Sequence, residues 1–378
     1  MQDAFDAIVM GGGIIGRATA WYLGKSGRHT LLLEQHDPEV PQGSSRGYSR
    51  VFGESFADNL RYEFARQSRY LWQELESETG DKLLYLNGGV DISMGENAKK
   101  VAAKLKSRGS PFELLDSNSL CRRYPQWHCD SSVNAIYSPD TGILEAERCM
   151  REVLLSAQKN KVTVRGRSQV TKIEPSHSGT VLVKTTSGET YRTQKLVIAA
   201  GPWAFDILAQ LGVTLPIKVS QEQIVYFEPL RNIDSFRPEN FPTWEWDGSD
   251  FVYGIPVFEK NGIKIAFHWD RHYLKSVKEF SSIPSVSVIE RLRLFLQEHL
   301  PDAAGEAFGA MTCMYTNIPD REHVIDTVPG FPQVAYFTGC NGNAFHRAPA
   351  IGKILTELLY EGKTSIDISS LSAKRFKV

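Results

Sequence analysis

The sequence has 378 residues, more than a single hydrophobic core usually covers, so we expect two domains or one interleaved pair. Apolar residues make up 42% and charged residues 23%, as in an ordinary globular enzyme, and the formal net charge is −1. This balance excludes the large basic field that a nucleic acid or an anionic membrane attracts, so we expect neither as a partner.

The N-terminal stretch and the cysteines favour a cytoplasmic protein. The chain opens with acidic residues and a short apolar run, unlike a signal peptide, and no apolar stretch is long enough to span a bilayer. An odd number of cysteines without regular spacing argues against a disulfide framework or a metal site. The five are Cys121, Cys129, Cys149, Cys313 and Cys340.

The first elements predict a β–α–β unit. Residues 5–10 are a short apolar run ending in glycines, which is typical of a buried parallel strand. A helix is predicted from about Ile14 to Lys25, and the run HTLLLEQ after it predicts a second buried strand.

The next part of the chain alternates between helix and strand patterns. Residues 57–78 predict an amphipathic helix, with Asp58 as its cap and Gly80 just past its end. Residues 83–145 are mixed and shorter in period, and residues 146–160 predict a helix. Three strand-like runs follow: KVTVRG, VLVKTT and KLVIAA.

The pattern changes between about residues 215 and 320. The alternating runs SQEQIVYFE, DFVYGIP and GIKIAFHW predict an antiparallel sheet, which a helix at residues 285–299 interrupts. The run QVAYFTG then predicts a buried strand, and a final helix is predicted from about Pro349 to Tyr360.

Together these elements predict a fold with α/β and α+β parts, in which an antiparallel-sheet substrate domain is inserted into a Rossmann-like nucleotide-binding domain. The discontinuous nucleotide-binding domain is expected to comprise residues 1–82, 146–214 and 321–378. The substrate domain is expected to comprise residues 83–145 and 215–320.

A glycine motif lies between the first strand and the first helix. Gly11, Gly13 and Gly16 form G-x-G-x-x-G, which allows a tight turn, a close approach of the backbone to a pyrophosphate and close helix–strand packing. Glu34 ends the second strand, where a carboxylate accepts hydrogen bonds from a ribose diol and disfavours NADP. The motif alone does not separate FAD from NAD.

Three further segments favour FAD. KLVIAAGPW is a strand that passes a second time beside the dinucleotide, and SSRGYSR offers hydroxyls and arginines to phosphates or to the flavin. TGCNGNAF precedes the last helix, whose positive end is able to stabilise reduced flavin. The residues expected to bind FAD are Gly11, Gly13, Ile14, Ile15, Gly16, Glu34, Gln35, Ser44, Ser45, Arg46, Ser49, Arg50, Val170, Ala200, Gly201, Trp203, Cys313, Gly342, Asn343, Ala344, Phe345 and His346.

On these segments, together with LWQELE, YGIP and CMYTNIPDREHVID, nearly the whole chain resembles one flavoenzyme family. It is the family of monomeric sarcosine oxidase, N-methyltryptophan oxidase and pipecolate oxidase, with the D-amino-acid-oxidase-like fold. The resemblance implies oxidation of secondary amino acids to imines with O2 as electron acceptor. It also implies FAD attached as an 8α-S-cysteinyl adduct, with Cys313 as the attachment residue.

The same resemblance assigns roles to residues of the predicted sheet. Lys264 matches a lysine near flavin N5 that promotes reaction with O2, and His268 matches a histidine that faces the substrate. The expected catalytic residues are Lys264, His268, Tyr315, His346 and Tyr253. Cys313 and Tyr315 share one face of a strand, and a cation such as Arg46 would lower the thiol pKa. The residues alone leave open a buried free cysteine and a solvated lysine.

Two positions depart from the family. Family members hold the substrate carboxylate with an arginine and a lysine, and here these positions are Gly53 and His346. The substrate is therefore expected not to be simple sarcosine, unless a shifted arginine such as Arg347 or Arg46 fills the site.

The function expected is oxidation of a C–N bond in a secondary amine, an N-methyl or cyclic imino acid or a related metabolite, giving an imine and hydrogen peroxide. The expected protein is a monomer whose partners are a small-molecule amine and O2. Alternatives are a flavin dehydrogenase with another electron acceptor and a biosynthetic oxidase of a larger amine. A nicotinamide-dependent dehydrogenase and a non-catalytic nucleotide-binding protein also stay open.

Overall fold

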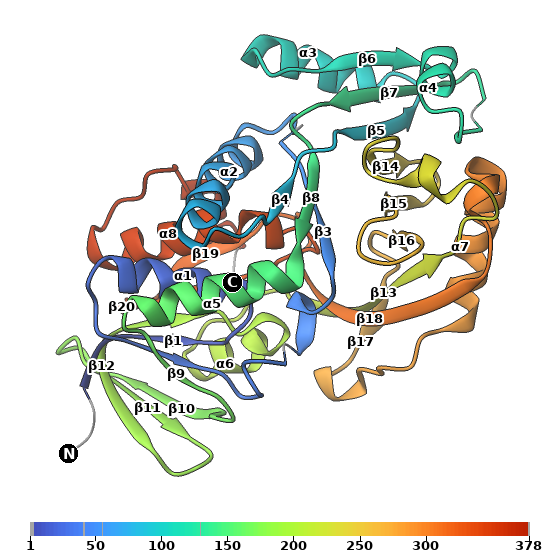
Figure 1. Ribbon diagram of the computed structural model, residues 1–378. Helices are drawn as coiled ribbons and strands as arrows, with labels where there is room; N and C mark the ends of the chain where they lie inside the picture. The colour runs from blue at the N-terminus through green and yellow to red at the C-terminus, as the bar shows by residue number, and fades with distance from the viewer. Residues whose placement is uncertain (1–3, 41, 55, 129, 377–378) are drawn as a thin grey trace.

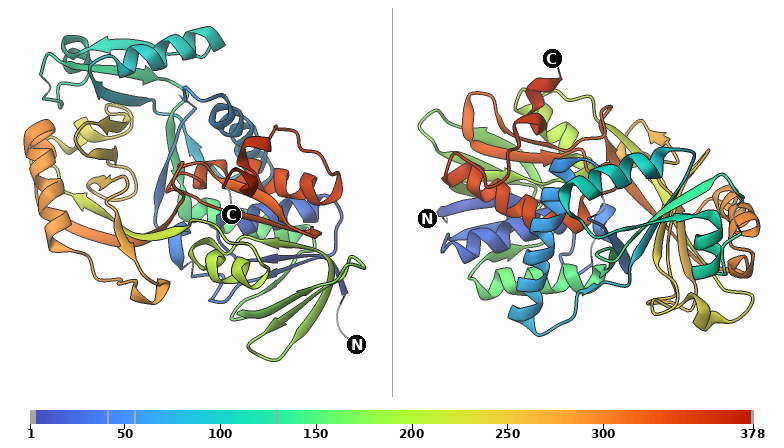
Figure 2. Two further views of the ribbon diagram at one scale, coloured as in Figure 1. Left: turned by 180° about the vertical axis from the view of Figure 1, so that it is seen from behind. Right: turned by 90° about the horizontal axis from the view of Figure 1, so that it is seen from above.

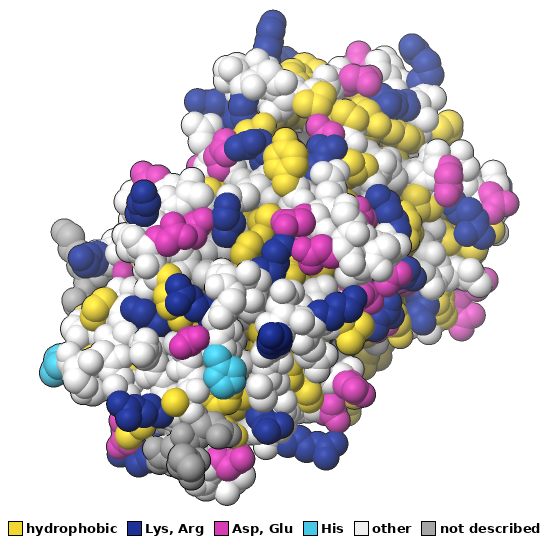
Figure 3. Space-filling view, turned by 60° about the vertical axis from the view of Figure 1, so that its left-hand side comes forward, with side chains coloured by type: hydrophobic (Ala, Val, Ile, Leu, Met, Phe, Trp, Pro, Cys, Tyr) yellow, Lys and Arg dark blue, Asp and Glu magenta, His cyan; other side chains and the backbone are white. Residues whose placement is uncertain are grey.

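The computed structural model describes residues 4–40, 42–54, 56–128 and 130–376. Its elements gather around two large sheets in different halves of the molecule, with a small third sheet between them (Figures 1 and 2). No helix among the described residues is long and apolar enough to cross a membrane. On the face shown in Figure 3, basic and acidic side chains are interspersed, so neither sign dominates it.

The first sheet has eight strands and a parallel centre. Its parallel strands are β1 (Ala4–Met10), β2 (Thr30–Leu33), β9 (Thr163–Arg165), β12 (Thr190–Ile198) and β20 (Phe331–Thr338). Antiparallel strands complete it: β10 (Val170–Pro175), β11 (Val181–Thr185) and β19 (Val324–Val328). The predicted runs at residues 5–10 and in HTLLLEQ are β1 and β2.

Helices cover both faces of this sheet, because successive side chains of the buried strands point in opposite directions. In β1, Ala7 and Val9 join a core with helices α1 (Ile14–Lys25), α5 (Ala146–Lys159) and α8 (Ala348–Tyr360). Ile8 and Met10 join the core on the other face, with α6 (Ala204–Gln210). Figure 1 shows α1, α5 and α8 together on one side of β1 and α6 on the other.

Helix α2 (Asn59–Thr79) packs against α8 and α5 and has the ends predicted from its sequence. The Asp58 side chain accepts a hydrogen bond from the backbone nitrogen of Arg61, and Gly80 takes a left-handed conformation with φ of 79°. These two residues satisfy backbone groups that the helix leaves free at its ends, which is why both boundaries could be predicted.

The second sheet has nine strands and is antiparallel except where β14 runs parallel to β5. Its strands are β5 (Gly89–Met94), β6 (Glu113–Asp116), β7 (Val133–Ser138), β13 (Lys218–Phe227), β14 (Thr243–Asp247), β15 (Phe251–Ile255), β16 (Ile263–Phe267), β17 (His272–Leu274) and β18 (Ala307–Asn317). Helix α7 (Val286–His299) covers one face, while α3 (Asn97–Arg108) and α4 (Ser117–Arg123) lie near β6 and β7.

The two faces of the second sheet differ in chemistry. One is an apolar core in which Val252, Ile265 and Phe267 pack with Leu292 and Leu296 of α7. Cross-strand partners lie on the same side of a sheet, and one such row joins Glu245, Tyr253, Ala266, Ile224 and Met311. Tyr253 of this row lines the cavity described below with Lys264 and Tyr226, a cross-strand pair two residues along the strands, so this face carries polar side chains.

A third sheet connects the two halves. It contains β3 (Ser49–Phe52), β8 (Gly142–Glu145) and β4 (Leu84–Tyr85). The fold predicted from the sequence, a Rossmann-like unit with an inserted and mainly antiparallel sheet, is confirmed. The parallel pairing of β14 with β5 was not expected. Cys121, Cys149, Cys313 and Cys340 are free thiols, and Cys129 lies outside the described residues.

Candidate functional site

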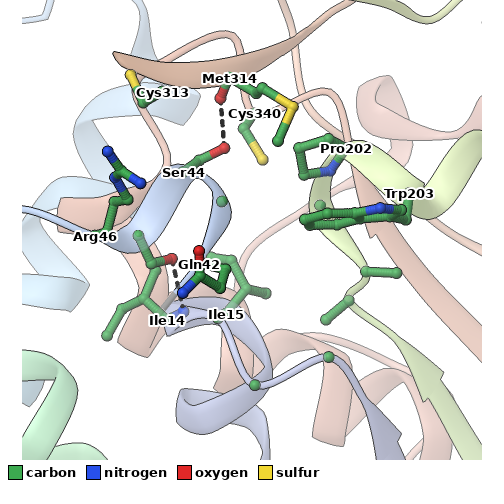
Figure 4. Close-up of a pocket in the computed structure, with 18 of the residues that line it drawn as sticks. Ile14, Ile15, Gln42, Ser44, Arg46, Pro202, Trp203, Cys313, Met314 and Cys340 are labelled. Carbon is green, nitrogen blue, oxygen red and sulfur yellow. Dashed lines mark hydrogen bonds between the residues drawn. The ribbon is translucent and has the colours of Figure 1, made fainter. Parts of the chain in front are cut away.

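One elongated cavity runs from the glycine turn after β1 to the polar face of the second sheet. Its walls include Gly11 and Glu34 at one end and Lys264, Cys313 and Tyr315 at the other. Figure 4 shows Ser44 and Arg46 lying between the start of α1 and Cys313, with Trp203 along another wall. The cavity therefore connects the two regions that the sequence assigns to cofactor and substrate.

The glycine turn cannot carry side chains. A Cβ atom at Gly11, which has φ of 106°, would lie 2.4 Å from the carbonyl oxygen of Ala199, and one at Gly16 would lie 1.8 Å from that of Gly11. Gly16 does not line the cavity, so it serves packing of α1 against the turn, whereas Gly11 and Gly13 are on the wall. This leaves the N-terminus of α1 open to an anion.

Two polar groups fix the neighbourhood of the turn. Glu34 accepts hydrogen bonds from the backbone nitrogens of Gly12 at 2.6 Å and His36 at 2.8 Å, so its carboxylate is held at the cavity wall. The Ser45 hydroxyl accepts a hydrogen bond from the nitrogen of Ile14 at 3.1 Å. Arg17 was not predicted as a site residue, yet it is buried and donates to the carbonyl oxygens of Gly12 and Met150, both at 2.7 Å.

The segment from Ser44 to Arg50 links the first half to the second sheet. Ser44 donates a hydrogen bond to the carbonyl oxygen of Met314 on β18 (Figure 4). Arg50 donates to the carbonyl oxygens of Ser44 at 2.9 Å and Arg46 at 2.7 Å, and lies 5.1 Å from the ring centre of Phe345. The Nε atom of Arg46 is buried and has no hydrogen-bond partner among the described residues, so it is free to bind a ligand.

Cys313 and Tyr315 lie two residues apart on β18, and both line the cavity as predicted. The expected lowering of the thiol pKa is not found. Burial raises the pKa of Cys313 to about 11, and the charges of Arg50, Lys264 and Arg46 only partly oppose it. Desolvation of the thiolate outweighs the attraction of the three cations.

Lys264 is buried on β16 and is hydrogen-bonded to the third sheet. Its Nζ donates to the carbonyl oxygen of Ser49 at 2.6 Å. Ser49 in turn donates from its hydroxyl to Glu259 at 2.9 Å. Burial, reinforced by the charge of Arg50, lowers the pKa of Lys264 to about 7. Ser49 itself is not on the cavity wall, so the structure places it behind Lys264 and not beside a ligand.

His268 lies one residue beyond the end of β16, so the predicted strand is shorter than the GIKIAFHW run. Its ring centre is 5.7 Å from that of Tyr315 and 6.1 Å from that of Tyr253. Burial lowers the pKa of His268 to about 3, so the ring is neutral near pH 7. Tyr253 and Tyr315 line the cavity, and burial raises the pKa of both hydroxyls.

The turn before α8 closes the cavity. A Cβ atom at Gly342, which has φ of 77°, would lie 2.2 Å from the Tyr315 ring, so glycine is required both by conformation and by space. Ala344 and Phe345 line the cavity with Gly342, whereas Asn343 and His346 do not. The turn is tied to β18 because Cys340 donates its backbone N–H to Thr316 at 3.0 Å.

Gly53 and His346, where the resemblance led us to look for cations, lie near one aromatic ring. A Cβ atom at Gly53 would lie 3.9 Å from Cζ of Phe56. His346 is buried and stacks on Phe56, with ring centres 6.0 Å apart and an interplanar angle of 6°. The Phe56 side chain therefore lies beside both Gly53 and His346.

Most of the predicted cofactor residues line this one cavity. The structure brings together Gly11, Gly13, Ile14, Ile15, Glu34, Gln35, Ser44, Ser45, Arg46, Arg50, Val170, Ala200, Gly201, Trp203, Cys313, Gly342, Ala344 and Phe345. Gly16, Ser49, Asn343 and His346 were predicted but do not line the cavity, and neither does the predicted catalytic residue His268. Ile224, Tyr226 and Met311 were missed, although they share the face of Lys264 and Cys313 by cross-strand register.

These features fit FAD. In the glycine turn, Gly11 and Gly16 have no room for a Cβ atom, and Glu34 is held at the cavity wall, where its carboxylate can accept hydrogen bonds from a ribose diol. The cavity then continues past Arg46, whose Nε has no partner among the described residues, to Lys264 and Tyr315 on the second sheet.

The comparisons with known proteins agree with this geometry. Residues 6–358 match the family described as FAD dependent oxidoreductase. Monomeric sarcosine oxidase of Bacillus sp. (strain NS-129) is 30% identical over 99% of this chain and 98% of its own. Peroxisomal sarcosine oxidase of Homo sapiens is 29% identical over 99% and 97%.

Two solved structures share the fold. NikD, described as an unusual amino acid oxidase essential for nikkomycin biosynthesis, has a TM-score of 0.85 at 23% identity, covering 98% of this chain and 97% of its own. L-Proline dehydrogenase from P. horikoshii has a TM-score of 0.86 at 19% identity, covering 100% and 99%.

Proposed function

Because the chain belongs to the family of FAD dependent oxidoreductases, we propose that it oxidises the C–N bond of a secondary amine, giving an imine and hydrogen peroxide. The family and the sarcosine oxidase relatives establish an FAD-dependent oxidoreductase of the sarcosine oxidase type, acting on amines or amino acids. The observation that carries the finer proposal is that Lys264, Tyr253 and Tyr315 line the same cavity as the glycine turn.

FAD would be held along this cavity by the residues of its wall. The turn at Gly11 and Gly13 and the N-terminus of α1 would hold the pyrophosphate, and Glu34 the adenosine ribose. When bound, FAD would take the hydride from the carbon beside the amine and supply electrons to O2. The FAD-binding domain would comprise residues 1–82, 146–214 and 321–378, and the substrate domain residues 83–145 and 215–320.

Lys264 would favour O2 as the electron acceptor. An ammonium group in a buried site stabilises the negative charge that O2 gains with its first electron. With a pKa of about 7, Lys264 is charged in a substantial fraction of molecules near neutrality. This feature weighs against the alternative of a flavin dehydrogenase that uses another acceptor.

His268, Tyr253 and Tyr315 would bind and orient the amine. The neutral His268 ring can accept a hydrogen bond from the amine through a nitrogen lone pair, and the two tyrosine hydroxyls keep their protons because burial raises their pKa values. Removal of the ammonium proton is required before hydride transfer, because the nitrogen lone pair must stabilise the carbon that loses the hydride. His346, which lies off the wall, would contribute to the substrate end of the site.

Cys313 would attach FAD covalently as an 8α-S-cysteinyl adduct. Its place on β18, at the end of the cavity away from the glycine turn, supports this proposal, because the isoalloxazine ring must lie at that end. The thiol with a pKa of about 11 requires a base or a charge change on cofactor binding before it reacts.

The substrate would be an N-methyl or cyclic imino acid or a related metabolite, other than simple sarcosine because of Gly53 and His346. A larger amine, oxidised in a biosynthetic pathway, is the second candidate, favoured by the aromatic ring of Phe56 at the altered positions. The enzyme would work as a cytoplasmic monomer.

Anaerobic mixing with a panel of amines tests the proposal. The panel includes sarcosine, L-proline, L-pipecolate and N-methyl-L-tryptophan, and the flavin absorbance is followed. We expect at least one secondary amine to bleach the flavin and, after air is admitted, to give one hydrogen peroxide per amine oxidised. Bleaching without peroxide on re-oxidation would support the dehydrogenase, and a flavin that no amine bleaches would contradict amine oxidation.

A further inference from the structure

Arg347 is a buried arginine at the start of α8 that no charged partner satisfies. Its side chain is 2% exposed, and no carboxylate among the described residues lies within 4 Å of its guanidinium. The nearby arginine Arg61 is bonded to Glu322, so that carboxylate is already engaged. A buried charge without a close counter-ion is costly, which indicates that an anion is supplied from outside the chain.

The hydrogen bonds of Arg347 leave one whole edge of the guanidinium free. Nη1 lies 3.3 Å from Nε2 of His323, whose Nδ1 is 2.9 Å from the carbonyl oxygen of Gly339. Since Nδ1 then carries the proton of the neutral ring, Nε2 accepts from Arg347. Nε and Nη2 are buried and have no partner among the described residues. These two nitrogens form the edge that binds a carboxylate with two parallel hydrogen bonds.

The free edge belongs to the region where the family pattern is broken. The Arg347 guanidinium lies 4.7 Å from the ring centre of Phe56, the same ring that stacks on His346 and lies beside Gly53. The Nε2 atom of His346 is also buried without a partner among the described residues. Burial raises the pKa of Glu245, and the charge of Arg347 partly opposes that rise. Since Glu245 is in the cross-strand row of Tyr253, the charge of Arg347 reaches the polar face of the second sheet.

We propose that Arg347 binds the carboxylate of the substrate through Nε and Nη2, replacing the cations absent at positions 53 and 346. His323 is a positioning residue that holds Nη1 and leaves Nε and Nη2 available to the carboxylate. The substrate class is then an amino or imino acid, whose carboxylate lies toward α8 while its amine lies toward His268 and Tyr253. This inference rests on the proposed amine oxidation and adds the anionic group to it.

Ligand binding to the oxidised holoenzyme tests the inference without turnover. The probe is pyrrole-2-carboxylate, an unreactive planar analogue of a cyclic imino acid, and its neutral counterpart is pyrrole-2-carboxamide. Their dissociation constants are measured from the perturbation of the flavin spectrum. We expect Arg347→Met to weaken carboxylate binding ~100-fold, the loss of a bidentate charge-assisted pair, and Arg347→Lys to weaken it less. Carboxamide binding should change less than about 3-fold, since it lacks the charge.

Arg66→Met is the matched control, because it removes an arginine of α2 whose charge is paired with Glu63 at the surface. It should leave both dissociation constants within about 2-fold of the wild type. If Arg347→Met does not retain FAD, two other measurements test the role of Arg347. They are the carboxylate affinity of Arg347→Lys and the ratio of the two dissociation constants in the wild type. Equal binding of the two probes by the wild type, or unchanged carboxylate affinity in a folded Arg347 variant, would overturn the role of Arg347. Amine-dependent bleaching by the wild type would still stand in that case.

Discussion

Lys264 shows how burial alone changes the chemistry of a side chain at this site. An exposed lysine is charged throughout the physiological range, but enclosure between β16 and β3 removes the water that stabilises its ammonium. The resulting pKa of about 7 places the change of charge near neutrality. The carbonyl oxygen of Ser49 keeps the amine in place whether or not it is protonated.

Lys264→Met should therefore slow electron transfer to O2 by about 100-fold or more, while anaerobic bleaching by the amine changes much less. Because only the ammonium form stabilises negative charge on O2, the wild-type rate should fall as the pH rises through about 7, and the variant should show no such step. Stopped-flow mixing of the reduced enzyme with oxygenated buffer measures the rate of electron transfer to O2 and its dependence on pH. Lys218→Met, at an exposed position of β13, is the control. A variant as fast as the wild type would remove Lys264 from the reaction with O2.

The alternation of strand residues was sufficient to predict which neighbours on one strand share a face. Cys313 and Tyr315 were paired in this way, and both line the cavity. Cross-strand partners were missed, as Met311 shows, because register between distant segments is not encoded in either segment alone. The conformation of the Arg347 side chain could not be predicted either, because it depends on a hydrogen bond to His323, which is 24 residues away in the sequence.

At the scale of elements, the junction between β1 and α1 is the part most sensitive to volume. Gly16→Ala would bring a methyl group against the carbonyl oxygen of Gly11, so that α1 must move away from the turn. We expect a loss of about 1–3 kcal/mol in the free energy of unfolding and a lower content of bound FAD. Thermal unfolding and the ratio of flavin to protein absorbance measure the two effects.

Gly309→Ala is the matched control, because its Cβ would meet only Cδ2 of Tyr226 at an ordinary 3.6 Å. A Gly16→Ala variant with the full flavin content and the unfolding temperature of the wild type would show that the tight turn is not needed for the cofactor.

Elements with local end signals were predicted closely, and elements defined by distant pairing were not. Helix α2 begins after Asp58 and ends before Gly80 because both residues satisfy the helix ends locally. The strand β14 was not anticipated, and its parallel partner β5 lies about 150 residues earlier in the chain. Nothing in either segment specifies that partner, and tertiary packing decides it.

At the scale of the whole molecule, the cavity forms because residues of two different sheets line it together. The parallel sheet supplies the glycine turn and Glu34, while the second sheet buries its apolar face against α7 and offers its polar face to the cavity. The third sheet joins them through β3, which carries Ser49 and Arg50 next to Lys264. The overall architecture could be predicted from the pattern of the segments. The stacking of Phe56 on His346 and its approach to Gly53 could be found only in the three-dimensional structure.

The absorption spectrum of the purified chain, recorded before and after denaturation, tests the central claim most directly. The claim is that one FAD lies along the cavity with its flavin end beside Cys313. We expect one flavin per folded chain, colour that stays with the precipitated wild-type chain, and colour released into the supernatant from Cys313→Ser. A properly folded chain that is colourless and takes up no added FAD would contradict the account. Colour released equally from both proteins would contradict the place given to Cys313.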